Sequence, residues 1–177
     1  VNAGSSSLKF SIYPTLHGSV LPSLLSGTFE GLEPGGKPEL RYSHLGKELI
    51  VNYSDHGEDP FISALMHLKV LLLDIPDLPP IRAVSHRIVH GGSEFNQAVI
   101  ATDAILDKLS KMSMLAPLHQ PHSLDGVRAF SLAFPGIPQV LCFDTAFHRT
   151  MSNLETSLAL PKEITDQGVR RYGFHGI

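Results

Sequence analysis

Apolar and polar side chains alternate along the first third of the chain, and a period of two residues indicates β-strands. In the clearest case, Leu8, Phe10 and Ile12 alternate with polar residues after the small-residue stretch 3–7. Residues 1–2 look like the stub of an earlier strand, so we expect the stretch 3–7 to turn between the two strands of a hairpin. Further strands are predicted at 23–32, 39–43 and 48–53.

The pattern changes to helical spacing at Pro60. Asp59 and Pro60 suit the N-cap and the first helical position, and apolar residues recur at helical spacing until a proline-rich segment at 75–80. Downstream, helices are predicted at 103–112 (capped by Thr102), 121–134 and 162–167, and strands at 81–89, 99–101, 138–143 and 169–174. Hairpins that give way to alternating helices and strands predict one α/β domain without an internal repeat.

The composition narrows the class of protein. The chain has 177 residues, which is long enough for a sizeable core. Its residues are 42% hydrophobic and 18% charged, and this composition excludes a disordered chain. A net charge of -3 and the lack of a Lys/Arg-rich run give no electrostatic case for a nucleic-acid partner. The apolar runs are too short to span a bilayer, and the single cysteine, Cys142, excludes an internal disulfide. We therefore expect a cytoplasmic protein with no membrane partner, in which Cys142 is a small buried hydrophobe.

Candidate chemistry lies at the ends of predicted strands, where open α/β sheets bind ligands. Arg87 beside the apolar Val89 suits a small carboxylate, with a charge for its head and an apolar contact for its tail. Asp144 follows a buried strand and could hold a magnesium ion or orient a nucleophile, and His175 between two glycines could donate to developing charge. Each residue also has a purely structural alternative: Arg87 as part of an ion pair, Asp144 as a turn cap and His175 as a loop histidine.

The turn at residues 3–7 is a candidate phosphate site. Its glycine, its successive N–H groups and its serine hydroxyls can cradle a phosphate, and Lys9 adds a cation nearby. An ordinary hairpin loop has the same composition, so this alternative stays open.

The histidines do not predict a zinc site. His86 and His90 share one face of a predicted strand, with Arg87 on the other, and His119 and His122 lie at a helix start. Neither pair has a third ligand nearby in the sequence. Walker A, G-x-G-x-x-G and G-x-S-x-G patterns do not occur.

Several long segments together resemble the acetate kinases. They occur in the order found in that family, as N-A-G-S-S-S-L-K-F (2–10), S-H-R-I-V-H-G-G (85–92), L-A-P-L-H (115–119), F-D-T-A-F-H (143–148) and R-R-Y-G-F-H-G (170–176). The resemblance implies an α/β fold of the actin-like ATPase (ribonuclease H-like) type. Such a domain has a mixed five-stranded sheet with flanking helices, here with extra hairpin strands.

The resemblance also implies an activity, the reversible transfer of the γ-phosphoryl group of ATP to acetate with Mg²⁺ or Mn²⁺. It implies catalytic roles for Arg87, Asp144 and His175, with Arg87 binding acetate and the transferring phosphoryl group and His175 stabilising the transition state. The other implied roles are an acetate pocket for Val89, Leu118 and Phe174, phosphate contacts for Lys9, Ser5 and Ser7, and a position near the metal for Asn2. Because acetate is already an anion, Asp144 is better interpreted as an organiser of metal or geometry than as a general base.

The chain departs from the family in a few places. Gln120 replaces an asparagine that is common there, which predicts a weaker helix cap, and Ile177 replaces a threonine. Family members carry a second domain of similar size, so we expect residues 1–177 to be a single N-terminal domain with a truncated first strand and no C-terminal nucleotide-binding domain. Such a chain would bind acetate or phosphate weakly and not turn over alone.

Two other functions remain open from the sequence. One is a propionate kinase of the same family, and the other is a stand-alone anion-binding or actin-like module. The resemblance implies a homodimer for the family and leaves the state of this chain open.

Overall fold

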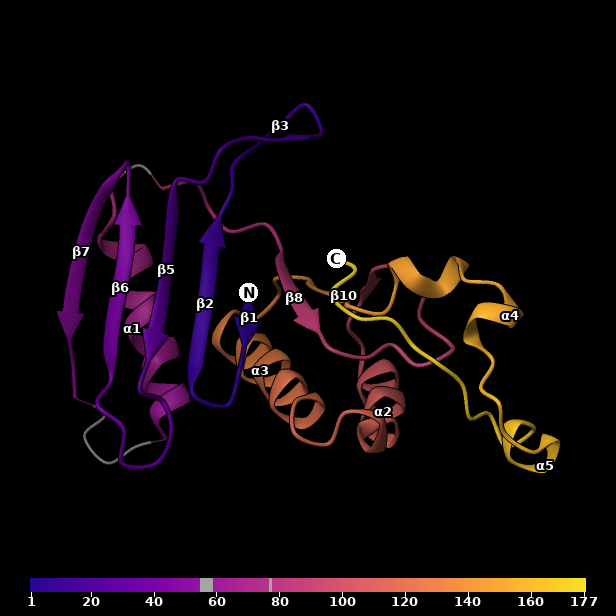
Figure 1. The fold of residues 1–177 in the computed structure, drawn as a ribbon. Coiled ribbons are helices and arrows are strands. Elements are labelled where there is room, and N and C mark those ends of the chain that lie inside the picture. The colour runs from indigo at the N-terminus through magenta and orange to yellow at the C-terminus, as the bar shows by residue number, and fades with distance from the viewer. Residues whose placement is uncertain (55–58, 77) are drawn as a thin grey trace.

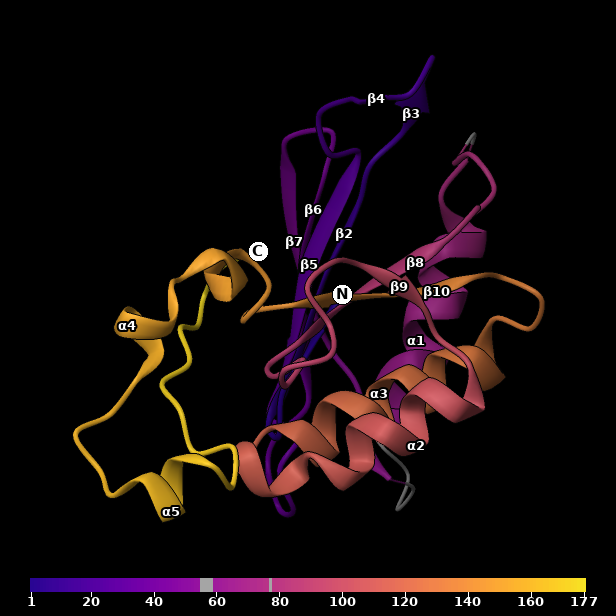
Figure 2. The ribbon, with the colours of Figure 1, turned by 90° about the vertical axis from the view of Figure 1, so that its right-hand side faces the viewer.

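The computed structural model describes residues 1–54, 59–76 and 78–177. Its helices are α1 (Pro60–Asp74), α2 (Asp103–Lys111), α3 (Gln120–Ala133), α4 (Asn153–Thr156) and α5 (Lys162–Thr165), with single 3₁₀ turns at Ser113–Leu115 and Phe147–Thr150. Strands form a wide layer with helices packed against it (Figure 1). A side view shows α1 on one side of the strands and α4 and α5 on the other (Figure 2).

The first ladder of strands is antiparallel and ordered β1-β2-β5-β6-β7. Its strands are β1 (Asn2–Ala3), β2 (Ser7–Ile12), β5 (Leu25–Glu30), β6 (Glu39–His44) and β7 (Lys47–Asn52), and β3 (Thr15–Leu16) and β4 (Ser19–Val20) form a separate small hairpin. The opening hairpin confirms the sequence prediction, because Asn2 pairs with Lys9 and Ala3 with Leu8. Across the turn, the Gly4 N–H donates to the Ser7 carbonyl at 2.9 Å.

The second ladder contains β8 (Val84–Ile88), β10 (Gln139–Phe143) and β9 (Val99–Ile100), in that order. As predicted for a buried strand, β10 runs parallel to β8. Val1 joins the two ladders: its amino group donates to the Ser85 carbonyl at 2.7 Å, and its carbonyl accepts from the Arg87 N–H at 3.0 Å. The predicted mixed sheet with flanking helices and extra hairpin strands is therefore present.

Helix α1 covers one face of the first ladder. The Asp59 carboxylate caps it by accepting from the N–H groups of Phe61 at 2.9 Å and Ile62 at 3.1 Å, which confirms the predicted cap. The core between α1 and the strands is built from alternating strand residues and one stripe of the helix: Leu8, Phe10, Leu25, Phe29, Leu40, Ala64, Leu65 and Leu68. Burial of these apolar side chains is the main stabilising contribution to this half of the domain.

Helices α2 and α3 enclose a second core against β8 and β10. The Thr102 hydroxyl caps α2 by accepting from the Ile105 N–H at 3.3 Å, as predicted. The buried members of this core are Ile88, Phe95, Leu106, Leu109, Leu124, Val127, Leu141 and Phe143. Because this core packs against the ends of β8 and β10, it fixes the position of the residues that follow both strands.

Two sequence predictions about the strands are wrong. Residues 169–174 form no strand: the Arg171 N–H donates at 2.8 Å to the carbonyl of Thr156, the last residue of α4. Just beyond this segment, the Gly176 N–H donates to the Asp144 carbonyl, also at 2.8 Å. Cys142 is half-buried rather than buried, because its side chain lies on the opposite face of β10 from Leu141 and Phe143. Partial burial still raises the pKa of the Cys142 thiol above its ordinary value.

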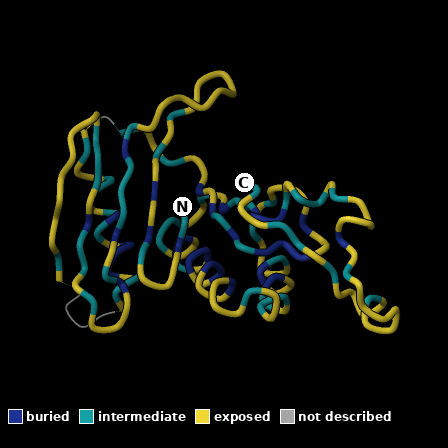
Figure 3. The backbone as a smooth tube through the Cα atoms, in the orientation of Figure 1, coloured by how far each residue is buried: buried dark blue, intermediate teal, exposed yellow. Residues whose placement is uncertain are grey.

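Burial is concentrated where α1 and α3 meet the sheet, whereas the outer strand β7 is exposed along its whole length (Figure 3). Among the described residues, no helix is both long and apolar enough to cross a membrane.

Candidate functional site

A cavity of about 550 Å³ opens beside β1. It is bounded by the turn at residues 3–7 (the serine turn), by the ends of β8 and β10, by the start of α3 and by the loop near the C-terminus. Every residue predicted for the site lines it: Asn2, Ser5, Ser7, Lys9, Arg87, Val89, Leu118, Asp144, Phe174 and His175. The fold thus brings together side chains that are up to 173 positions apart in the sequence, from Asn2 to His175. Their chemical roles stay predictions.

Arg87 and Asp144 form a bidentate ion pair in this cavity. Arg87 Nε donates to Asp144 Oδ1 at 2.8 Å, and Nη2 donates to Oδ2 at 2.6 Å. The pair forms because parallel β8 and β10 end at the same edge of the sheet, where the Asp144 N–H also donates to the Ile88 carbonyl. The Asp144 side chain is only 2% exposed, so it is held in one orientation. Hydrogen bonding to it raises the pKa of the Arg87 guanidinium above its ordinary value, which keeps the arginine charged.

His175 completes this cluster from the last loop. Arg87 Nη2 lies 3.2 Å from His175 Nδ1, and Asp144 Oδ2 lies 3.8 Å from the same nitrogen. Because a guanidinium can only donate, Nδ1 is the acceptor and the neutral ring carries its proton on Nε2. The His175 side chain is 82% exposed, which leaves Nε2–H accessible to a ligand.

The predicted acyl pocket is an open apolar wall. Val89 is half-buried, whereas Leu118 is 76% and Phe174 39% exposed. The Phe174 ring packs edge-on against the buried His90 ring, with centroids 5.5 Å apart, so its position is tied to the end of β8.

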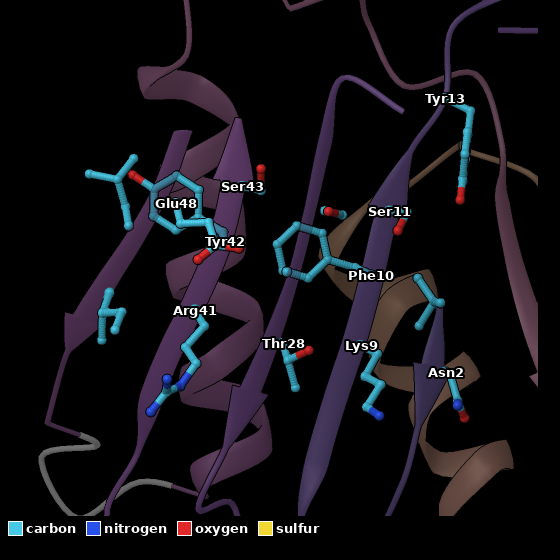
Figure 4. Close-up of a pocket in the computed structure, with 15 residues that line it drawn as sticks. Asn2, Lys9, Phe10, Ser11, Tyr13, Thr28, Arg41, Tyr42, Ser43 and Glu48 are labelled. Carbon is cyan, nitrogen blue, oxygen red and sulfur yellow. The ribbon is translucent and has the colours of Figure 1, made fainter. Parts of the chain in front are cut away.

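The serine turn is anchored at its centre. Leu32 N–H donates to the Ser6 carbonyl at 3.1 Å, which ties the turn to the loop after β5. Lys9 and Asn2 are directly opposite in the β1–β2 pairing, and their side chains lie next to each other (Figure 4). This places a cation and an amide side by side at the edge of the cavity.

A larger hollow of about 720 Å³ lies on the open face of the first ladder (Figure 4). It shares Asn2 and Lys9 with the cavity, and its other polar lining is mostly hydroxyl groups, from Ser11, Ser26, Thr28 and Ser43. None of Arg87, Asp144 and His175 lines it. Of the two hollows, only the smaller cavity is therefore lined by Arg87, Asp144 and His175.

Three further polar residues that the sequence did not assign to the site line the cavity: His119, His122 and Ser123. From the sequence alone the two histidines are candidates only for a metal pair, although L-A-P-L-H ends at His119 and marks that position. They gather here because α3 begins at the cavity.

Gln120 does not act as the cap that the sequence predicted. The structure places His119 at the N-cap, and Gln120 is fully buried. Its Oε1 accepts from the His90 N–H at 3.1 Å and its Nε2 donates to the His90 carbonyl at 2.8 Å. Gln120 therefore satisfies both backbone groups of a residue where the chain leaves β8.

We expect the substitution Gln120→Ala to lower the free energy of unfolding by roughly 1–3 kcal/mol, because it leaves buried backbone groups of His90 without partners. Urea denaturation would measure the change. The matched control is Gln167→Ala, which removes an exposed side chain that donates to the Glu163 carbonyl. Equal losses in the two variants would contradict the assigned role of Gln120.

The cavity offers oxygen donors that suit magnesium. The candidates are the amide oxygen of Asn2 and the carboxylate of Asp144, both of which line it. Within the described residues, no group of three His, Cys, Asp or Glu side chains converges on a possible metal position. Magnesium commonly keeps several waters and binds one or two protein oxygens together with substrate phosphates. The donor set therefore fits an ion that is held mainly by a phosphate ligand.

Comparison with known proteins identifies the family of this chain. The family model described as the acetokinase family matches residues 1–177. The chain belongs to the acetokinase family. It is 38% identical over 179 residues to the acetate kinase of Nitrobacter hamburgensis, covering 100% of this chain and 44% of the relative. It is 40% identical over 177 residues to acetate kinase 2 of Vibrio parahaemolyticus, covering 99% of this chain and 43% of the relative.

Solved structures of a propionate kinase and an acetate kinase share this fold. A propionate kinase from Francisella tularensis superposes with a TM-score of 0.84 at 32% identity, covering 99% of this chain and 44% of the other. The acetate kinase of Porphyromonas gingivalis gives a TM-score of 0.83 at 37% identity, again covering 99% of this chain and 44% of the other. The predicted actin-like α/β fold is confirmed, and the chain spans less than half the length of the relatives that it matches.

Proposed function

We propose that this chain carries the acetate- and phosphoryl-binding half of a carboxylate kinase site, which converts ATP and acetate into ADP and acetyl phosphate. The observation that carries the proposal is the cluster of Arg87, Asp144 and His175 in the cavity that contains all the predicted site residues. Membership in the acetokinase family supports a carboxylate as the acceptor. The nucleotide-binding half would come from a second domain, so we propose that residues 1–177 alone do not turn over.

The proposed reaction requires little proton transfer. An oxygen of the acetate carboxylate forms a bond to the γ-phosphorus while the bond from that phosphorus to the β–γ bridging oxygen breaks, and ADP leaves with the electron pair. The acceptor is already an anion, so the main task is to position the reactants and neutralise charge on the phosphoryl oxygens. Arg87 supplies a fixed positive charge, and His175 Nε2–H supplies a hydrogen-bond donor.

The remaining residues of the cavity orient these groups. Asp144 holds the guanidinium by two hydrogen bonds, so its role is to orient Arg87 rather than to act as a base. Val89, Leu118 and Phe174 would contact the methyl group, while Lys9, Ser5 and Ser7 would contact nucleotide phosphates. When Mg²⁺ is bound, through Asn2 and Asp144, it would neutralise charge on the phosphates.

The test is formation of acetyl phosphate, trapped as the hydroxamate, by the complete gene product with MgATP and acetate. We expect turnover by that protein and none by residues 1–177. If the complete protein binds acetate or phosphate without turnover, the chain is an anion-binding module instead.

Propionate is a second candidate acceptor. The apolar wall of the cavity is open at Leu118, so a tail longer by one carbon would fit, and one structural neighbour is a propionate kinase. Competition between acetate and propionate in the hydroxamate assay would decide which acid has the higher kcat/KM.

A further inference from the structure

The loop that carries His175 is wrapped around the ring of another histidine, His148. His148 lies in the 3₁₀ turn Phe147–Thr150, and its Nε2 is 2.8 Å from the Phe174 carbonyl. A carbonyl can only accept, so His148 Nε2 carries a proton and donates it to the loop. This hydrogen bond is made to the residue directly before His175.

The two glycines of G-F-H-G make room for the His148 ring. A Cβ atom on Gly173 would overlap the ring, and a Cβ on Gly176 would lie 3.2 Å from His148 Cδ2 and 2.6 Å from Phe147 Cβ. The ring therefore fills the space between both ends of the loop. Any side chain at Gly173 would push the loop away from the ring.

His175 needs such support because its own backbone is in the left-handed region, with φ of +58°. A non-glycine residue holds this conformation at a cost of roughly 1 kcal/mol or more, and keeps it only where its surroundings fix the loop. The Gly176 N–H donates to the Asp144 carbonyl at 2.8 Å, so the loop is fixed on both sides of His175.

Asp144 and His148 belong to one short segment after β10. Asp144 holds Arg87 through its carboxylate, and His148 holds the loop of His175. The contact of 3.2 Å between Arg87 Nη2 and His175 Nδ1 therefore depends on both anchors of this segment.

We propose that His148 is a positioning residue: it fixes the conformation of the loop 173–176 and thereby holds His175 Nδ1 against Arg87. The catalytic consequence rests on the proposed kinase function, whereas the positioning does not. A displacement near 1 Å of a group that contacts the reacting atoms can lower a rate by about 100-fold.

Three substitutions separate the ring from the hydrogen bond. His148→Gln keeps a donor near the position of Nε2, His148→Phe keeps the ring without the donor, and His148→Ala removes both. His44→Ala, at the end of β6 and outside the cavity, is the control. The readouts are the tautomer of His175, from its ¹⁵N chemical shifts, and kcat and KM in the complete gene product.

The wild-type protein is expected to hold His175 as the Nε2–H tautomer, and His148→Ala to give a mixture of tautomers. We expect kcat to fall about 100-fold in His148→Ala with KM for MgATP within about twofold, and His148→Gln to recover at least about tenfold of that loss. If His148→Ala does not fold, the tautomer must shift in His148→Phe and not in His148→Gln.

Unchanged ¹⁵N shifts of His175 in a folded His148→Ala or His148→Phe variant would overturn the proposal. So would a kcat in His148→Ala within twofold of that of His44→Ala. If the wild-type protein transfers no phosphoryl group at all, the proposed function fails, and the ¹⁵N shifts still decide the role of His148.

Discussion

Replacing Arg87 by lysine is expected to lower kcat/KM for acetate by about 100- to 1000-fold in the complete gene product. An ammonium group carries the same charge but cannot reproduce the planar fork that binds both oxygens of Asp144 and also contacts His175. The positive charge would therefore no longer be held in a fixed position. The measurement is acetyl phosphate formation over a range of acetate concentrations.

The Arg87→Lys substitution is preferable to alanine for this test. Alanine would leave the Asp144 carboxylate buried without a charge partner, which commonly destabilises a protein by about 3–5 kcal/mol and confuses folding with catalysis. Arg128→Lys is the matched control, because Arg128 pairs with Asp125 on an exposed helix surface at 3.0 Å. Near wild-type kcat/KM in Arg87→Lys would show that the bidentate geometry has no role in the reaction.

The parts of the fold that the sequence predicts are those decided by local contacts. The alternation of Leu8, Phe10 and Ile12 and the cap at Asp59 each involve residues only a few positions apart. Residues 169–174 show where this reasoning fails. They have the composition of a strand, but a strand also needs a neighbouring strand, and the Arg171 N–H bonds instead to Thr156 at the end of α4.

In the site, too, local features are predictable from the sequence and contacts between distant residues are not. Arg87 and Asp144 were predictable candidates because Arg87 lies near the end of β8 and Asp144 directly follows β10, and parallel strands end at a common edge. Their bidentate pairing and its contact with His175 were not predictable, because they depend on side-chain orientation across 88 positions of sequence. The role of Gln120 is not predictable from the sequence for a related reason: its partner, His90, lies 30 positions away.

Acidification is expected to destabilise the domain through His86, which is buried in β8 with 2% exposure. Gln139 Nε2 donates to the Ile137 carbonyl at 2.8 Å, so its Oε1 faces His86 Nε2 at 2.7 Å and accepts the proton of the neutral ring. The Phe130 ring packs edge-on against His86, with centroids 5.2 Å apart. Burial in this environment lowers the pKa of His86 from 6.5 to about 4.

The sign of the pH effect follows from that lowered pKa. Well above pH 6.5 the His86 ring is neutral in both the folded and the unfolded chain, so its titration does not affect stability there. Between pH 6.5 and about 4 the unfolded chain binds the proton and the folded chain does not, so the free energy of unfolding falls as pH falls. Below pH 4 the loss levels off at roughly 3 kcal/mol, since each pKa unit corresponds to about 1.4 kcal/mol.

Urea denaturation at pH 7.5 and pH 4.5 of the wild type and of His86→Gln would isolate this contribution. Glutamine can donate to Gln139 Oε1 but does not titrate, so we expect it to lower stability at pH 7.5 and to reduce the loss between the two pH values by roughly 2–3 kcal/mol. His17→Gln, at an exposed turn between β3 and β4, should leave the pH dependence as in the wild type. A loss on acidification that is the same in His86→Gln as in the wild type would mean that other groups carry the acid sensitivity, because nothing else in that comparison titrates differently.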